Sequence, residues 1–173
     1  MLHVTTTPSV AYVTRVDSFD CGVMISASHN PFYDNGIKLI NGRGEKMDDQ
    51  TIADIEAYLD GNLAALGLEG DVPAARREEL GEIVDYVSGR NRYVGYLISL
   101  AAHSYKNMRV GLDCANGSSW NIAKTVFEAL GGEDVCHQRG AGRCEHQPRR
   151  GFHAYRRSAP LCGGKPLGRG LCL

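Results

Sequence analysis

The segment from Gly22 to Lys38 constrains this chain more than any other part of its 173 residues. An apolar run at residues 22–25 is followed by the hexapeptide S-A-S-H-N-P at residues 26–31 and, one residue later, by Y-D-N-G-I-K at residues 33–38. The apolar run predicts a strand. A strand that ends in such a loop presents side chains at a sheet edge, where α/β proteins usually bind ligands. We therefore expect an α/β fold with a ligand-binding loop after this strand.

The same segment also fits a purely structural turn. Pro31 disfavours the helical region at Asn30, and D-N-G at residues 34–36 supplies the positive-φ positions of a tight turn. Strands at residues 23–26 and 37–40 are therefore expected to pair. In this interpretation the segment is a decorated turn without a chemical role.

Three side chains of the segment are candidates for phosphoryl chemistry: Ser28, His29 and Lys38. A phosphorylated Ser28 would carry about −1.5 to −2 charges and three acceptor oxygens, so it needs a nearby cation; its structural alternative is a turn hydroxyl. His29 is a candidate hydrogen-bond donor to that phosphate, or else a solvated loop histidine. Lys38 is expected on the strand face opposite Ile37 and Leu39, which are expected to face the core. It is either a charge clamp or general base beside a phosphate, or a surface lysine.

Together, S-A-S-H-N-P and D-N-G-I-K resemble the active-site serine loop of the α-D-phosphohexomutases. The resemblance implies that Ser28, and not Ser26, carries a phosphate, and that Lys38 takes part in acid–base chemistry at the sugar hydroxyl. It also implies Mg²⁺ as the cofactor, held by an oxygen of phosphorylated Ser28 and by three aspartates of a D-G-D-x-D-R loop. That loop, the sugar-recognition G-E-x-S-G loop and the phosphate-binding R-x-S-G-T loop are absent from this sequence.

The serine motif resembles most closely the amino-sugar branch of that family, which interconverts glucosamine 6-phosphate and glucosamine 1-phosphate through a bisphosphate intermediate. The alternatives are the phosphomannomutase and phosphoglucomutase branch and, from another class, a non-catalytic binding module with an arginine-rich tail. The expected partner is a small sugar phosphate, with no nucleic acid and no membrane. Because the aspartate loop is missing, we expect the chain as written to lack mutase turnover.

Charge divides the chain into two unequal parts. Residues 1–133 hold 11 Lys and Arg against 18 Asp and Glu, whereas residues 134–173 hold 8 against 2. The sequence shows neither a basic-plus-apolar leader nor an apolar run near 18 residues, so a cytoplasmic protein without a membrane span is expected. In that compartment the six cysteines are not expected to form disulfides.

Apolar periodicity predicts an α/β succession around the serine loop. Before the loop, we expect a short helix with Pro8 near its start. After it, we expect a helix that is capped by Asp48 or Asp49, ends at Gly61 and carries Ile52, Ile55 and Leu59 on one face, and then a helix at about residues 88–104. A strand Arg109–Asp113 should follow, and then a helix whose inward residues are Ile122, Val126, Phe127 and Leu130. The last strand and helix resemble the start of the second phosphohexomutase domain.

The expected domains follow from that resemblance, which covers residues 3 to about 132 and begins in the middle of a domain. Residues 1–104 are expected to form the C-terminal part of the first domain, with the serine loop. Residues 105–133 would open the second domain, and residues 134–173 would be a basic tail outside the family. The chain is therefore expected to be a fragment.

The tail at residues 134–173 lacks the periodicity of a helix or strand and is expected to be disordered or misread. The pattern Cys136-His137 with Cys144-x-His146 matches no strong zinc motif. An arginine-rich nucleic-acid arm would lack an aromatic stacking platform. A third hypothesis is a gene read one base out of frame after about Glu133. With permissive wobble bases, the shifted tail reads VINAAPDGVNINRDAGSTH and later VVENHLDVGFAY, which resemble the next family segments.

Overall fold

The computed structural model describes residues 1–28, 30–31, 33–114, 117–136 and 169–172. The strands of these residues are β1 (Cys21–Ile25), β2 (Ile37–Asn41), β3 (Arg109–Asp113), β4 (Glu133–Cys136) and β5 (Arg169–Cys172). The helices are α1 (Thr7–Val16), α2 (Asp49–Leu59), α3 (Val87–Ser99) and α4 (Trp120–Ala129), with 3-10 turns at Leu63–Leu66 and Arg77–Glu79.

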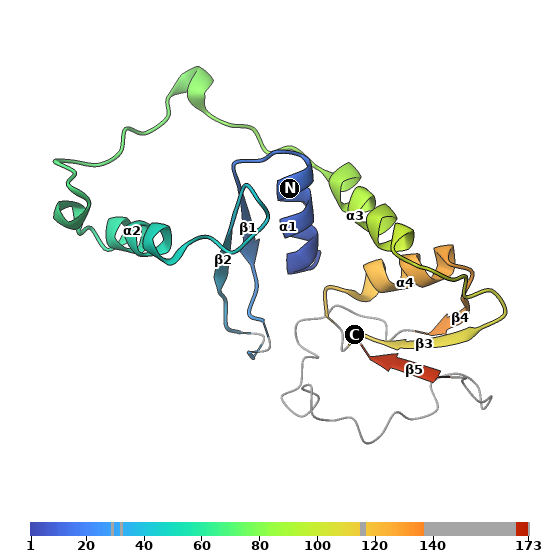
Figure 1. Ribbon diagram of the computed structural model, residues 1–173. Helices are drawn as coiled ribbons and strands as arrows, with labels where there is room; N and C mark the ends of the chain where they lie inside the picture. The colour runs from blue at the N-terminus through green and yellow to red at the C-terminus, as the bar shows by residue number, and fades with distance from the viewer. Residues whose placement is uncertain (29, 32, 115–116, 137–168, 173) are drawn as a thin grey trace.

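These elements form two small sheets joined through helices (Figure 1). Strands β1 and β2 make an antiparallel hairpin against which α1 packs, while β4, β3 and β5 make a parallel sheet with α4 against it. Helix α3 contacts both α1 and α4. The α/β class predicted from the sequence is thereby confirmed.

Helix α1 precedes the hairpin, has a capped N-terminus and lies in close contact with strand β1. The side chain of Thr6 accepts a hydrogen bond from the backbone N–H of Ser9, and Pro8 lies in the first turn of α1, as expected near a helix start. Strand β1 then passes so close to α1 that a Cβ on Gly22 would lie 2.4 Å from Thr14 Oγ1. Only glycine fits there without a shift, so this contact sets which face of the hairpin α1 covers.

The covered face of the hairpin is not the predicted one. The strands pair as expected, with Gly22 opposite Ile40 and Met24 opposite Lys38. Ile40 is buried, but Ile37 is 70% exposed and Leu39 is only half-buried, so the prediction that these last two face the core is wrong. Strand alternation separates two faces, but which one is covered depends on where α1 packs, and that contact is not local in sequence.

Helix α2 starts and ends where the sequence predicts. The Asp48 carboxylate accepts hydrogen bonds from the Thr51 backbone N–H at 2.9 Å and from its hydroxyl at 2.8 Å. After the helix, Gly61 adopts a φ of +76°, the left-handed conformation that commonly ends helices. No residue of α2 is buried, so its capping, rather than packing, accounts for its bounds.

Helix α3 is anchored to the end of α1 by a buried carboxylate. The side chain of Asp17 is 9% exposed, accepts a 2.8 Å hydrogen bond from the Tyr86 hydroxyl and forms an ion pair with Arg92. Tyr93 of α3 is also buried, and its ring lies 5.5 Å from that of Tyr12 in α1. Burial is the main factor that raises the pKa of Tyr93.

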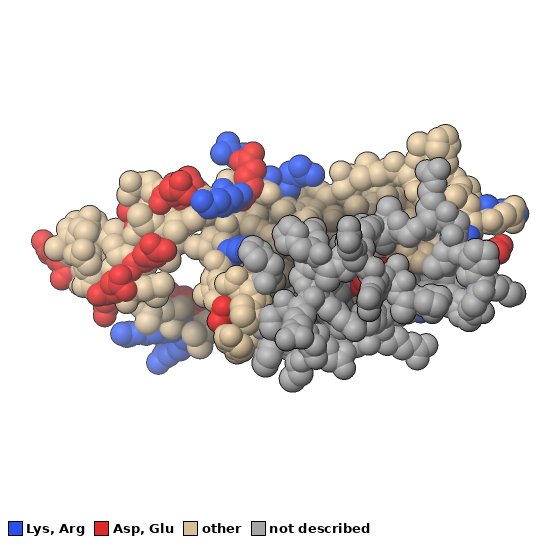
Figure 2. Space-filling view, turned by 90° about the horizontal axis from the view of Figure 1, so that it is seen from below, with Lys and Arg blue, Asp and Glu red and all other residues tan. Residues whose placement is uncertain are grey.

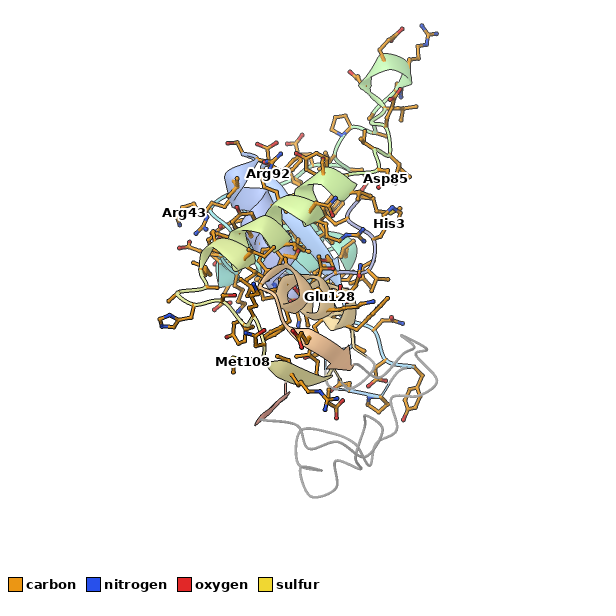
Figure 3. All side chains as sticks on the ribbon, turned by 90° about the vertical axis from the view of Figure 1, so that its right-hand side faces the viewer. His3, Arg43, Asp85, Arg92, Met108 and Glu128 are labelled. Atoms are coloured by element: carbon orange, nitrogen blue, oxygen red, sulfur yellow. The ribbon has the colours of Figure 1, made fainter. Side chains whose placement is uncertain are left out.

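The first residues of the chain are tied to the segment just before α3. The Met1 amino group contacts the Val84 carbonyl, and the Tyr86 N–H donates to the Met1 carbonyl at 2.9 Å. His3 Nε2 lies 3.0 Å from an oxygen of Asp85, and both side chains are labelled in Figure 3. Residues 1–3 and 84–86 therefore lie side by side although they are distant in sequence.

The helix predicted at about residues 88–104 ends at Ser99. The chain then turns toward the end of α4, where the Tyr105 N–H donates to the Leu130 carbonyl at 2.8 Å and the Ser104 hydroxyl donates to the same oxygen at 3.2 Å. These bonds to a distant carbonyl replace the next helical turn, which explains the earlier end.

The parallel sheet contains the most buried apolar cluster of the described residues. Leu112 in β3 is 1% exposed and packs with Val110, Cys114 and Ala123 of α4. Phe127 and two further aromatic side chains pack against this cluster. The predicted strand–turn–helix is confirmed, with Ile122 buried on α4.

Strands β4 and β5 are the regular elements that the structure describes in the tail. Both include residues beyond Asp134, where no regular structure was expected, and both pair in parallel with β3. Each has four residues, too few for an alternation to be recognised in the sequence, and pairing with β3 defines them. The predictions for Cys144, His146 and the rest of residues 137–168 lie outside the described residues.

Candidate functional site

The serine loop connects β1 to β2 and so lies at the closed end of the hairpin. Pairing continues for one residue past β1, because the Ser26 N–H donates to the Gly36 carbonyl at 2.8 Å. Two turns follow, closed by the Asn30 N–H on the Ala27 carbonyl at 3.0 Å and by the Asp34 N–H on the Pro31 carbonyl at 2.9 Å. The hairpin therefore fixes both ends of the loop.

Ser28 is exposed on this loop and has an unusual backbone conformation. Its φ is +55°, in the left-handed region that residues with a Cβ rarely adopt. Its backbone N–H donates to Ser26 Oγ at 3.0 Å. In the structural alternative, Ser28 is expected to be the turn hydroxyl, but the hydroxyl that accepts this hydrogen bond belongs to Ser26. The sequence signal for this bond is the position of Ser26 in a turn, two residues before Ser28, because serine side chains often accept hydrogen bonds from nearby backbone N–H groups in turns.

Lys38 lies on the same face of the hairpin as Ser26. Lys38 pairs with Met24, and the Ser26–Gly36 hydrogen bond continues the same register, so Ser26 and Lys38 are diagonal neighbours across the two strands. The Lys38 side chain is exposed. Of the three predicted catalytic residues, the structure brings Lys38 and the start of the serine loop together; His29 lies outside the described residues.

The first turn of α1 lies at the same end of the hairpin as the serine loop. The short connection Asp17–Asp20 turns the chain back, so β1 runs antiparallel to α1 and ends near the helix start, as Figure 1 shows. A helix N-terminus carries a partial positive charge that favours anions within about one turn.

Acidic side chains gather on another part of the molecule. Figure 2 shows Asp and Glu on the side of α2, which carries Asp49, Asp54 and Glu56 and is capped by Asp48. Among the residues that the structure describes, no group of three or more His, Cys, Asp or Glu is placed to hold a metal ion. The described residues therefore do not complete a Mg²⁺ site around Ser28.

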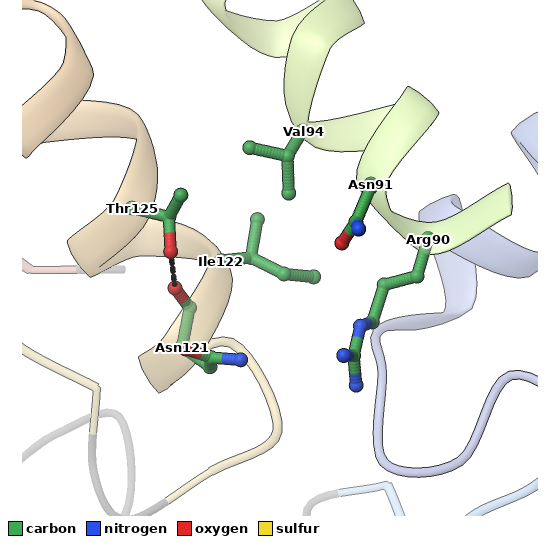
Figure 4. Close-up of a pocket in the computed structure, with 6 residues that line it drawn as sticks. All are labelled: Arg90, Asn91, Val94, Asn121, Ile122 and Thr125. Carbon is green, nitrogen blue, oxygen red and sulfur yellow. Dashed lines mark hydrogen bonds between the residues drawn. The ribbon is translucent and has the colours of Figure 1, made fainter. Parts of the chain in front are cut away.

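A cavity of about 300 Å³ lies between α3 and α4. Figure 4 shows its six lining residues, namely Arg90, Asn91, Val94, Asn121, Ile122 and Thr125. The Thr125 hydroxyl donates to the Asn121 carbonyl at 2.8 Å. None of the six belongs to the serine loop, and they include no nucleophile paired with a base. No local sequence pattern predicts this cavity, because it forms between two helices that are separate in sequence.

Two further observations concern the whole described part of the chain. None of its helices combines the length and apolar character that crossing a membrane requires. Neither Cys21, which is exposed, nor Cys114, which is buried, forms a disulfide bond.

Comparison with known proteins agrees with the serine loop and its hairpin. Residues 1–65 match the family model described as phosphoglucomutase/phosphomannomutase, alpha/beta/alpha domain I. The chain is 65% identical over 131 residues to a phosphoglucosamine mutase of Lachnospira eligens and 56% identical over 131 residues to one of Lachnoclostridium phytofermentans. A phosphoglucosamine mutase of Streptococcus pneumoniae is 44% identical over 132 residues.

Each of these alignments covers 76% of this chain but only 28% of the relative, so the chain spans a minor part of the length of the curated relatives it matches. The matched family model contains the α1 helix, the hairpin, the serine loop and α2. The motif resemblance and the two comparisons thus agree on the same residues, and residues 1–65 are similar to domain I of the phosphoglucomutase/phosphomannomutase family.

Proposed function

We propose that this chain carries the phosphoserine segment of a phosphoglucosamine mutase, with Ser28 as the residue that holds the phosphoryl group. The observation that carries the proposal is the exposed Ser28 at the end of a paired hairpin, on a loop whose backbone is fixed by hydrogen bonds. The named relatives support glucosamine phosphates as substrates over mannose or glucose phosphates.

The proposed chemistry needs a carrier, a cation and a proton acceptor. The bond between Ser28 Oγ and phosphorus breaks while a bond from a sugar hydroxyl oxygen to phosphorus forms. The sugar hydroxyl loses its proton, and Ser28 Oγ takes one up. In the second half of the reaction, the other phosphoryl group of the bisphosphate moves to Ser28 Oγ, which loses its proton, and the freed sugar oxygen takes up a proton. Such transfers depend mainly on positioning and charge neutralisation.

Lys38 is the described side chain best placed for the second and third roles. It is exposed, and it pairs across the hairpin with Met24, two residues before Ser26. It would act either as a cation beside the transferred phosphoryl group or as the base that takes the hydroxyl proton. We also assign His29 the role of hydrogen-bond donor to the phosphate.

Mg²⁺ is the cofactor that we propose for the complete enzyme, where it would neutralise phosphoryl charge. A phosphorylated Ser28 would supply one of its oxygen ligands, and hard cations such as Mg²⁺ favour oxygen. The remaining ligands would come from outside the described residues. A cytoplasmic location, and the lack of nucleic-acid and membrane partners, stay predictions.

A graft tests the assignment of Ser28. In this grafted mutase, the 131-residue segment of the chain replaces the matching segment of the Lachnospira eligens enzyme. Intact-mass analysis should find a phosphate on the graft and on its Ser26→Ala variant, but none on Ser28→Ala, which should also lose turnover of glucosamine 6-phosphate. A phosphate that remains on Ser28→Ala would place the carrier elsewhere. The 173-residue chain alone should show no turnover.

A further inference from the structure

The backbone of Ser28 adopts a conformation that serine does not favour. A φ of +55° brings Cβ close to the backbone, and only glycine, with some asparagine and aspartate, adopts this region routinely. Ser28 is also exposed, so burial of its side chain does not hold it in place. A hydrogen bond to the backbone of Ser28 can favour this conformation.

Ser26 supplies such a contact. Its Oγ accepts the Ser28 N–H at 3.0 Å, which bridges the residue between them and closes a local turn. A hydroxyl oxygen accepts this bond through a lone pair and can turn its own proton away, so the Ser26 hydroxyl remains able to donate elsewhere.

Ser26 is itself held by the hairpin rather than by the loop. Its N–H donates to the Gly36 carbonyl at 2.8 Å, directly after the Ile25–Ile37 pair. The backbones of Ser26 and Gly36 lie close together, since a Cβ on Gly36 would lie 3.0 Å from the Ser26 carbonyl oxygen. The Ser26 side chain is half-buried, in contrast to the exposed Ser28. Ser26 therefore transmits the fixed geometry of two paired strands to the first residues of the loop.

We propose that Ser26 is a positioning residue for the phosphoryl-carrying serine: its hydroxyl oxygen holds the Ser28 backbone in the left-handed conformation from which Oγ is presented. This role rests on the proposed function of Ser28. It assigns the two serines of the motif different tasks, one as hydrogen-bond acceptor and one as carrier. Positional errors near 1 Å can slow an enzymatic reaction by about a hundredfold, so a flexible Ser28 backbone would be costly even with the hydroxyl intact.

The requirement is an acceptor oxygen on the β-carbon of residue 26. Threonine keeps that oxygen, whereas alanine lacks it. Ser26→Thr and Ser26→Ala thus form a matched pair that separates loss of the acceptor from any change of side chain at this position.

The first experiment uses the 173-residue chain labelled with ¹⁵N and does not depend on catalysis. In Ser26→Ala, the Ser28 amide should exchange with solvent about five- to tenfold faster, the effect of one hydrogen bond, and its strong intraresidue amide–Hα NOE, a mark of positive φ, should weaken. Ser26→Thr should match the parent, and the amides of Val23 and Leu39 should stay unchanged in both. An unchanged Ser28 amide in Ser26→Ala, or the same change in Ser26→Thr, would overturn the proposal.

The second experiment places both variants in the grafted mutase. Ser26→Ala should keep its phosphate on Ser28 but lose about tenfold in kcat with little change in KM, and Ser26→Thr should recover the parent rate. Full kcat in Ser26→Ala would overturn the positioning role while Ser28 remained the carrier. A parent graft with no phosphate on Ser28 would instead overturn the proposed function, and the amide result would still decide whether Ser26 holds the loop.

Discussion

The β1–β2 hairpin and strand β3 use the same kind of apolar residues in opposite ways. The hairpin has two strands, contacts α1 on one face and leaves Val23, Ile25 and Ile37 more than half exposed on the other. Strand β3 is paired on both edges, and Leu112 in its centre is almost fully buried. The candidate chemistry lies on the hairpin, while the most buried cluster of the described residues lies around β3.

This difference predicts that function and stability respond to different substitutions. Side chains at the loop end of the hairpin are largely exposed, so changes there should alter chemistry with little effect on folding. Changes in β3 should do the reverse, since a buried side chain contributes through the apolar area it removes from water. Each prediction below tests this separation or its boundaries.

The largest expected effect is on catalysis at Lys38. In the grafted mutase, Lys38→Met should lower kcat by about 10²- to 10⁴-fold, the range associated with a positioned acid–base group. The melting temperature should change little, because Lys38 is exposed. Lys38→Arg separates the two proposed roles, since a charge clamp should survive as arginine and a base should not.

Lys46→Met is the matched control for Lys38. Lys46 is another exposed lysine, and it pairs with Asp49 at 2.7 Å on the acidic side of the molecule. Its loss should leave kcat close to that of the parent. Unfolding of Lys38→Met, with full specific activity in the fraction that stays folded, would show that Lys38 is structural and would break the comparison.

The next largest effect concerns stability at β3. Leu112→Ala should lower the free energy of unfolding of the 173-residue chain by about 2–5 kcal/mol, as large-to-small changes at buried leucines do. Ile37→Ala, in the hairpin, should stay within about 0.5 kcal/mol because the side chain it shortens is exposed. Chemical denaturation monitored by circular dichroism measures both, and equal losses would contradict the assignment of the core to β3.

A third prediction concerns the link between α1 and α3. Arg92→Met should destabilise the chain by about 1–3 kcal/mol, because it leaves the buried Asp17 carboxylate without its cation. The value is set below that of a fully buried pair because Arg92 is 45% exposed. Asp17→Asn combined with Arg92→Met should recover part of the loss, since the uncompensated charge is gone. Thermal unfolding of the two variants, with no difference between them, would argue against an electrostatic cause.

Local features of the sequence were sufficient to predict much of the hairpin region. The apolar runs on either side of the serine loop indicated the pairing of β1 and β2, and the Asp48 cap and Gly61 stop gave the bounds of α2. Each of these depends on residues a few positions apart, so no tertiary contact is needed to recognise it. The positive φ angles predicted for D-N-G at residues 34–36 are wrong, because the nearby turn is closed one step earlier, by the Asp34 N–H on the Pro31 carbonyl.

Most of the errors and omissions involve contacts between distant residues. Which face of the hairpin is covered depends on α1 meeting Gly22, and the early end of α3 depends on the Leu130 carbonyl. Strands β4 and β5 are defined by β3, and the cavity beside Arg90 needs two helices. The role of Ser26 was also missed, although it is local, because a second serine in the same motif drew the chemical interpretation.

The smallest expected effect lies at the start of α2, on the exposed side away from both compared regions. Hydrogen bonds from the Thr51 backbone N–H and then from its hydroxyl lower the pKa of Asp48 below its ordinary value of 3.8. The charged carboxylate is the better cap, so this stabilisation is present above the unfolded-state pKa and is lost as the pH falls through the lower folded-state pKa. Asp48→Asn keeps an acceptor and should remove the pH dependence, whereas Asp48→Ala should remove the cap at every pH.

The Thr51 amide shift, followed by NMR in an acid titration, measures this pH dependence directly, while the Ser28 and Leu112 amides serve as internal controls. If those two amides moved together with Thr51, α2 would be coupled to the hairpin and to β3, and the separation between exposed and buried regions would need revision.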